Sequence, residues 1–180
     1  LDVLDDNIRI RLISYFDSMP PNIFKNTLTL KNKIINILIR FVQFNNLNNQ
    51  SPEEIFLKFL YYIHTNITDE QVEKIRELIR RGVNPGLAPI YLTFFTNWDD
   101  DGQVEEARQQ YFNDGGLVET LEDTDISQIQ RDPFDVLDDT GGLSGDDKRL
   151  MVLKLLCLSY NVSTNTAISV LYQNDWNLEN

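Results

Sequence analysis

The sequence predicts an all-α fold, a helical bundle or irregular helical array, followed by an acidic linker and a small helical module. Three observations predict this class. Apolar residues recur at spacings of three and four along most of the chain. Helix-capping residues, glycines and prolines separate these stretches. The hydrophobic fraction of 42% is high enough to form a packed core.

Residues 1–114 are expected to form one domain of about six helices joined by short loops. The first helix should start at a cap on Asp5 or Asp6 and end near Ser18, because two prolines follow. Its apolar positions include Ile10. Residues 23–44 predict a long buried helix, since their apolar residues repeat at helical spacing.

Two helix starts carry strong local signals. Ser51 should cap a helix whose first residue is Pro52. Thr68 and Gln71 should form a capping box for the next helix. Gly82 then fits the left-handed position just past that helix.

Asn84-Pro85 starts the following element, and Gln103 to Phe112 forms a short helix that Asp114-Gly115-Gly116 ends. Apolar residues expected to be buried after the proline are Leu87, Ile90, Tyr91, Phe94 and Phe95.

Residues 75–88, with Gly82-Val83-Asn84-Pro85 at their centre, resemble the helix–GxNP–helix core of the MOZART family. Members of that family are small helical proteins that bind N-terminal regions of γ-tubulin-complex subunits, so the resemblance implies a protein partner. The same tetrapeptide is also a good helix–turn–helix junction, with glycine after one helix and proline starting the next.

Residues 115–145 predict an acidic linker. From Asp114 to Asp147 there are eleven acidic residues and one basic residue, a net charge of −10 within a chain of −12. Pro133 and a glycine-rich run at 141–145 favour extended chain. Apolar residues within the segment leave two interpretations: a solvated tether with a few residues packed on the helical domain, or docking on a basic protein surface.

Residues 146–180 predict a small helical module. Thr164 is expected to cap a helix that contains Ala167 and Leu171, and an Asn174-Asp175-Trp176 step leads into a third helix. This pattern resembles UBA-like domains of the TAP-C type, found in mRNA-export receptors, cullin-neddylation ligases and adaptors of the AAA unfoldase. The alternative is a helical hairpin that closes the domain.

The UBA-like resemblance implies binding of ubiquitin, a ubiquitin-like protein or a short hydrophobic peptide. The residues that it places at the contact are Tyr160, Asn161, Val162 and Leu178. Two departures concern the ligand. The loop 159–162 lacks the glycine of ubiquitin-binding members, and the given sequence stops one turn into the third helix.

No catalytic, cofactor-binding or metal-binding residues are predicted. The single histidine, His64, has no nucleophile motif near it in sequence. Residues 97–108 resemble the start of a calcium loop, but Arg108 stands where a bidentate glutamate is needed. We therefore interpret that stretch as an acidic helix start.

These features predict a non-enzymatic adaptor whose C-terminal module binds a protein. The alternative is a structural subunit in which the C-terminal helices pack on the N-terminal domain. The absence of a basic stripe disfavours binding to nucleic acid through phosphates, and no apolar run is long enough to span a membrane. A single cysteine, Cys157, fits a reducing compartment, so a cytoplasmic or nuclear location is expected.

Overall fold

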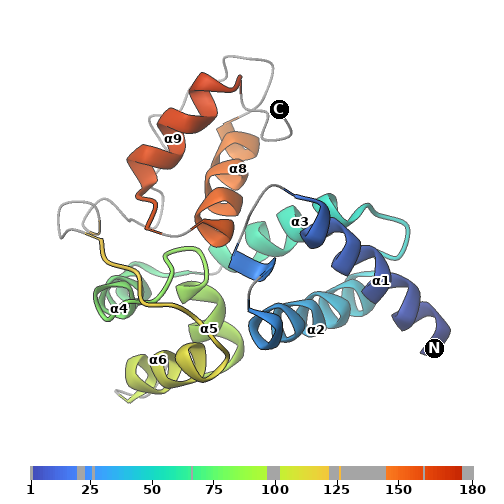
Figure 1. Cartoon of the computed structure of the whole chain (residues 1–180), viewed down its shortest axis with the longest axis horizontal. Coiled ribbons are helices and arrows are strands. Elements are labelled where there is room, and N and C mark those ends of the chain that lie inside the picture. The colour runs from blue at the N-terminus through green and yellow to red at the C-terminus, as the bar shows by residue number, and fades with distance from the viewer. Residues whose placement is uncertain are drawn as a thin grey trace.

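The computed structural model describes residues 2–19, 23–25, 27–65, 67–96, 102–121, 126, 145–159 and 161–175, and these residues contain helices and no strand. This confirms the predicted all-α class. Figure 1 shows α1, α2 and α3 on one side, α4, α5 and α6 on the other, and α8 with α9 above them. The elements are α1 (Asp2–Ser18), the 3₁₀ helix η1 (Ile23–Lys25), α2 (Leu28–Asn45), α3 (Pro52–Thr65), α4 (Asp69–Arg80), α5 (Ala88–Phe94), α6 (Gln103–Asn113), α8 (Gly145–Leu158) and α9 (Thr164–Gln173).

The strongest local signals are confirmed. The Thr68 hydroxyl accepts a hydrogen bond from the Gln71 backbone N–H, and the Thr68 N–H donates to Gln71 Oε1 at 2.9 Å, which completes the capping box. Helix α3 begins at Pro52, as predicted. Gly82 has a φ of 101°, so it occupies the left-handed region after α4.

Several predicted boundaries differ from the structure. Helix α1 already begins at Asp2, before the expected caps. The expected helix over 23–44 is divided into η1 and α2. Helix α9 is capped by Ser163 and not by Thr164, because Ser163 has the extended backbone (φ −80°, ψ 164°) that lets its hydroxyl accept from the Thr166 N–H.

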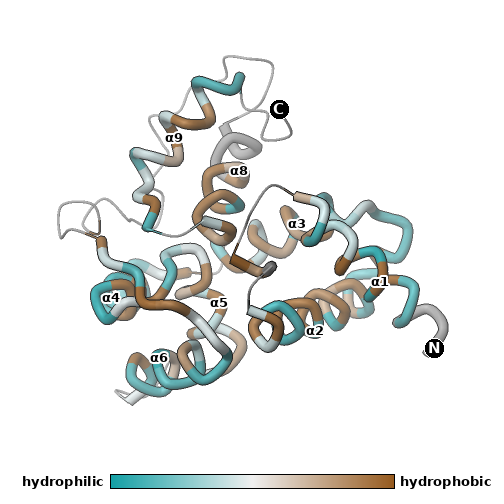
Figure 2. Tube along the Cα trace, in the orientation of Figure 1, coloured by the Kyte–Doolittle hydropathy of each residue, from teal (hydrophilic) through white to brown (hydrophobic). Residues whose placement is uncertain are grey.

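One hydrophobic core joins the N-terminal helices to α8. At one end, the ring of Phe16 on α1 packs edge-on against Phe24 at 5.0 Å and against Phe56 of α3 at 5.4 Å. At the other end, α8 supplies Leu153, Leu156 and other buried residues. Figure 2 shows hydrophobic turns on α2, α3 and α8, and α3 packs against both of the other helices.

Not every residue of the helical pattern is buried. Ile10 is 62% exposed, although it lies between the buried residues Ile8 and Leu12. Two positions along a helix turn a side chain about 200° away, so Ile10 lies on the opposite face. Phe94, which was expected to be buried, is 38% exposed, and Phe95 is only partly buried against the core. The sequence prediction for these two phenylalanines was therefore wrong in part.

Substitution of Phe16 by alanine should lower the free energy of unfolding by about 3–5 kcal/mol, because it empties a fully enclosed aromatic site. Ile10→Ala on the same helix is the matched control and should change it by less than about 0.5 kcal/mol. Urea unfolding followed by circular dichroism measures both. Equal losses for the two variants would contradict the assignment of the buried face of α1.

Candidate functional site

Half of the predicted protein-binding residues lie in the described part of the chain. Asn161 and Val162 are described, whereas Tyr160 and Leu178 lie outside the described residues, as does Trp176. Val162 is half-buried and packs against the core. Asn161 is exposed and has a φ of 56°, the left-handed conformation that asparagine tolerates better than most residues.

The backbone N–H and the side-chain oxygen of Asn161 both form hydrogen bonds within the chain. Its backbone N–H donates to Glu119 Oε1 at 2.9 Å. Its side-chain oxygen accepts from the Thr120 N–H at 2.7 Å. The loop that the resemblance assigned to a partner is therefore held against the first part of the segment predicted as a linker.

Asn84, in the turn between α4 and α5, meets the same carboxylate from the other side. Its amide nitrogen donates to Glu119 Oε2 at 2.7 Å and to the Ser159 carbonyl at 2.9 Å. Its amide oxygen accepts from the N–H groups of Gly86, at 2.9 Å, and Leu87, at 3.0 Å. Two donors and two acceptor positions are the full capacity of an asparagine amide, so this side chain is fully satisfied.

Glu119 is the centre of this arrangement. It is 2% exposed, and its own N–H donates to the Gly82 carbonyl at 2.8 Å. Burial raises the pKa of its carboxyl to about 7, against the opposing effect of the hydrogen bonds from Asn161 and Asn84. We call Asn84, Glu119 and Asn161 the polar junction, because they tie together the α4–α5 turn, the chain after α6 and the α8–α9 loop.

A close backbone contact lies beside the polar junction. A Cβ atom added to Gly86 would lie 2.6 Å from both Cα and Sγ of Cys157, and closer still to its backbone nitrogen. Only glycine therefore allows the α4–α5 turn to approach α8 this closely. The Cys157 thiol is fully buried, and burial raises its pKa, which makes it an unreactive thiol in the folded chain.

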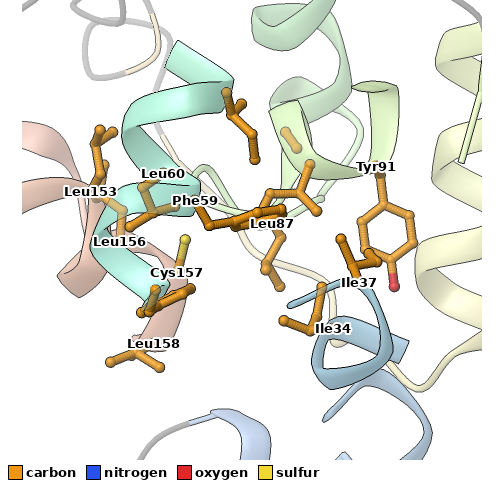
Figure 3. Packing of buried hydrophobic residues seen from close by; sticks show 14 of the residues in the cluster. Ile34, Ile37, Phe59, Leu60, Leu87, Tyr91, Leu153, Leu156, Cys157 and Leu158 are labelled. Carbon is orange, nitrogen blue, oxygen red and sulfur yellow. The ribbon is translucent and has the colours of Figure 1, made fainter. Parts of the chain in front are cut away.

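A charged contact ties α8 to α3 and α1. Lys154 is only 4% exposed, and its Nζ lies 2.6 Å from Glu53 Oε1 at the start of α3. The same ammonium group lies 5.4 Å from the centre of the Tyr15 ring of α1. In Figure 3, Leu153, Leu156 and Cys157 of α8 lie close to Leu60 of α3.

The described residues contain no group of three or more histidine, cysteine, aspartate or glutamate side chains placed to hold a metal ion. Residues 97–101 of the calcium-like stretch lie outside the described residues. Arg108 donates to Glu105 at 2.6 and 2.9 Å, so its guanidinium stabilises a neighbouring carboxylate on α6.

His64 lies in the last turn of α3, as expected. Within the described part of the chain, no helix is sufficiently long and apolar to cross a bilayer.

Comparison with family models, curated proteins and solved structures found no match to this chain. The resemblances to UBA-like domains and to the MOZART core therefore stay predictions.

Sequence reasoning missed Glu119 as a structural centre. Its surroundings in the sequence are acidic, and acidic residues in such a run are usually solvated. The one local signal was its position two residues after Leu117 and two before Leu121, in a short stretch with apolar residues. Its partners Asn84 and Asn161 lie 35 and 42 residues away, so no local pattern could identify them.

The raised pKa of Glu119 predicts a pH-dependent stability difference between the natural protein and Glu119→Gln. A folded pKa near 7 lies above the ordinary value of 4.5, so the folded state binds this proton more tightly. The stabilising contribution is complete below about pH 4.5 and is lost as the pH rises through 7. The stability of the natural protein relative to the variant should fall by roughly 3 kcal/mol over this range. Urea unfolding at a series of pH values measures it, and a difference independent of pH would contradict the assignment.

Gly86→Ala should lower the free energy of unfolding by about 2–3 kcal/mol and speed the reaction of Cys157 with a thiol reagent. The reason is that the new methyl group forces the α4–α5 turn away from α8. Gly115→Ala is the control: its φ of 98° is strained for alanine, but its Cβ would meet no atom within 4 Å. That variant should cost about 1 kcal/mol and leave Cys157 protected. Similar thiol reactivity in both variants would contradict the predicted contact.

Proposed function

We propose that this protein is a non-enzymatic interaction protein that acts as a structural subunit, with its C-terminal helices built into the same body as its N-terminal helices. The observation that carries this proposal is the polar junction, which joins three segments that are distant in sequence. A subunit of this kind offers a partner one preformed surface and not a module on a flexible tether.

Separation of α8 from the rest of the chain would be energetically unfavourable. It would expose Leu153, Leu156 and Cys157, each worth about 1–3 kcal/mol of burial. It would also remove the Glu53 partner of Lys154 and the Asn161 partner of Glu119. These costs support a single unit over an independently moving module.

The adaptor alternative, in which a UBA-like module binds ubiquitin or a hydrophobic peptide, requires the α8–α9 loop to be accessible. The Asn161 N–H already donates to Glu119, and the Asn161 side-chain oxygen already accepts from the Thr120 N–H. A ligand would have to replace these hydrogen bonds. For this reason we favour the structural-subunit proposal. Our proposal includes a protein partner and a cytoplasmic or nuclear location, where the thiol of the single cysteine would remain reduced.

The reactivity of Cys157 tests the proposal, because it is the only cysteine in the chain. If α8 is part of one body, the thiol should react with a thiol reagent only through global unfolding. The labelling rate should then rise with urea with the same dependence as the global unfolding equilibrium. If α8 and α9 move as a separate module, labelling should be fast and insensitive to low urea concentrations.

A control variant calibrates the reagent. Ser169 on α9 is exposed, so Ser169→Cys in a Cys157→Ser background should react at the rate of a free thiol. We expect Cys157 to react at least about a thousandfold more slowly, as for a site that opens only with the whole domain. Similar rates for the two cysteines would overturn the structural-subunit proposal and favour the adaptor.

A further inference from the structure

Residues of α2, α3 and α5 line an open groove with a volume of about 490 Å³. It lies along a face of α2 adjacent to the one that carries the buried residues Ile34 and Leu38. Its rim includes Phe44, which is 87% exposed, and the partly exposed residues Tyr62 and Phe94. We call this open groove the aromatic groove; its lining residues are Ile37, Arg40, Phe41, Phe44, Asn45, Tyr62, Phe94 and Phe95.

The floor of the aromatic groove is built from packed rings. Phe41 packs edge-on against Phe59 with ring centres 5.5 Å apart, and Phe94 stacks on the same ring at 5.3 Å. Tyr62 lies tilted against Phe41 at 5.7 Å. Phe41, Tyr62 and Phe94 are each held by a ring from a different helix, so the floor of the groove is preorganised. A ligand would not have to order it first.

The charge of the aromatic groove is opposite to that of the chain. The whole chain carries a net charge of −12, yet the lining contains one arginine and no acidic residue. Arg40 is exposed and forms no ion pair with any described residue. Lys33, nearer the start of α2, differs from it: its Nζ lies 2.7 Å from Asp114 Oδ2 and 4.1 Å from the centre of the Phe95 ring. Arg40 is therefore available to form an ion pair with a carboxylate of a partner.

The lining of α2 has the spacing of a helix-binding strip. Ile37, Phe41 and Phe44 follow one another at four and three residues, so they cover about 10 Å along one face. Helix-in-groove recognition uses anchors at this spacing on the bound helix. A second copy of this chain is a poor occupant, because two chains of charge −12 repel each other.

We propose that the aromatic groove binds the apolar face of a short amphipathic helix from a partner protein, with an acidic residue of that helix paired to Arg40. The inference rests on the proposed function as an interaction protein and names the partner's chemistry. Its test is independent of Cys157 labelling, since the groove can fail to bind while α8 stays integrated, and the reverse is also possible.

A displayed library of random 16-residue peptides, selected against the full chain, tests the proposal. We expect enriched peptides to combine apolar residues at spacings of three and four with at least one aspartate or glutamate. A synthetic, fluorescein-labelled copy of the most enriched peptide is then titrated with the protein by fluorescence polarisation. Phe44→Ala should weaken its binding at least about tenfold, because an exposed aromatic anchor is lost.

Charge reversal tests the role of Arg40. Arg40→Glu should weaken the labelled peptide at least about tenfold, and a peptide with its acidic residue changed to lysine should regain affinity for that variant. Two variants outside the aromatic groove are matched controls: Leu28→Ala removes an exposed apolar side chain, and Arg80→Glu reverses a charge on α4. Both should bind like the natural protein. Retained circular dichroism and melting temperature in each variant show that the fold is intact.

Several outcomes would overturn the proposal. One is a selection that enriches no peptide, or one whose peptides lack acidic residues. Another is binding that the Phe44 and Arg40 variants leave unchanged. A concentration-dependent dimer in analytical ultracentrifugation that Phe44→Ala abolishes would assign the aromatic groove to a second copy. Peptide binding that appears only after residues 127–144 are deleted would assign it to a segment of the same chain.

Discussion

The buried carboxylate of Glu119 is the constraint that fixes how the α4–α5 turn, the chain after α6 and the α8–α9 loop meet. An ionised carboxylate is unfavourable in a protein interior unless both of its oxygens accept hydrogen bonds. Here one oxygen is met by the Asn84 side chain and the other by the Asn161 backbone. The α4–α5 turn, the chain after α6 and the α8–α9 loop must therefore all be in place together. Loss of any one of them leaves a buried polar group without its partner.

This constraint explains the close approach of α8 to the remaining helices. The polar junction places the end of α8 beside the turn at Gly86, where the absence of a side chain allows backbone contact. About one turn before the end of α8, Lys154 contacts Glu53 and the Tyr15 ring, and apolar residues complete the contact with α3. Polar and apolar contacts act at different points along the same helix. The orientation of α8 is thus specified by hydrogen bonds, and its attachment is stabilised by burial.

Helix α2 has one buried face and one face that is open to solvent. Ile34, Ile35 and Leu38 are buried against neighbouring helices, whereas Phe44 on the adjacent face is open to solvent. Because α3 and α5 pack beside α2, their aromatic residues frame this open face and hold its rings in place. The same packing that forms the core therefore creates a preformed apolar surface outside it. A contiguous surface of that kind on a folded domain is typical of an interaction site.

The sequence by itself determined the all-α class, the capping box at Thr68, the left-handed glycine at position 82 and the approximate extent of most helices. These features depend on residues three or four positions apart, which any sequence displays directly. Only the tertiary structure decided that Phe94 would be exposed, that Glu119 would be buried and that Asn161 would form a hydrogen bond to Glu119. Burial depends on which helix lies opposite, and a hydrogen bond across 35 or 42 residues has no local pattern.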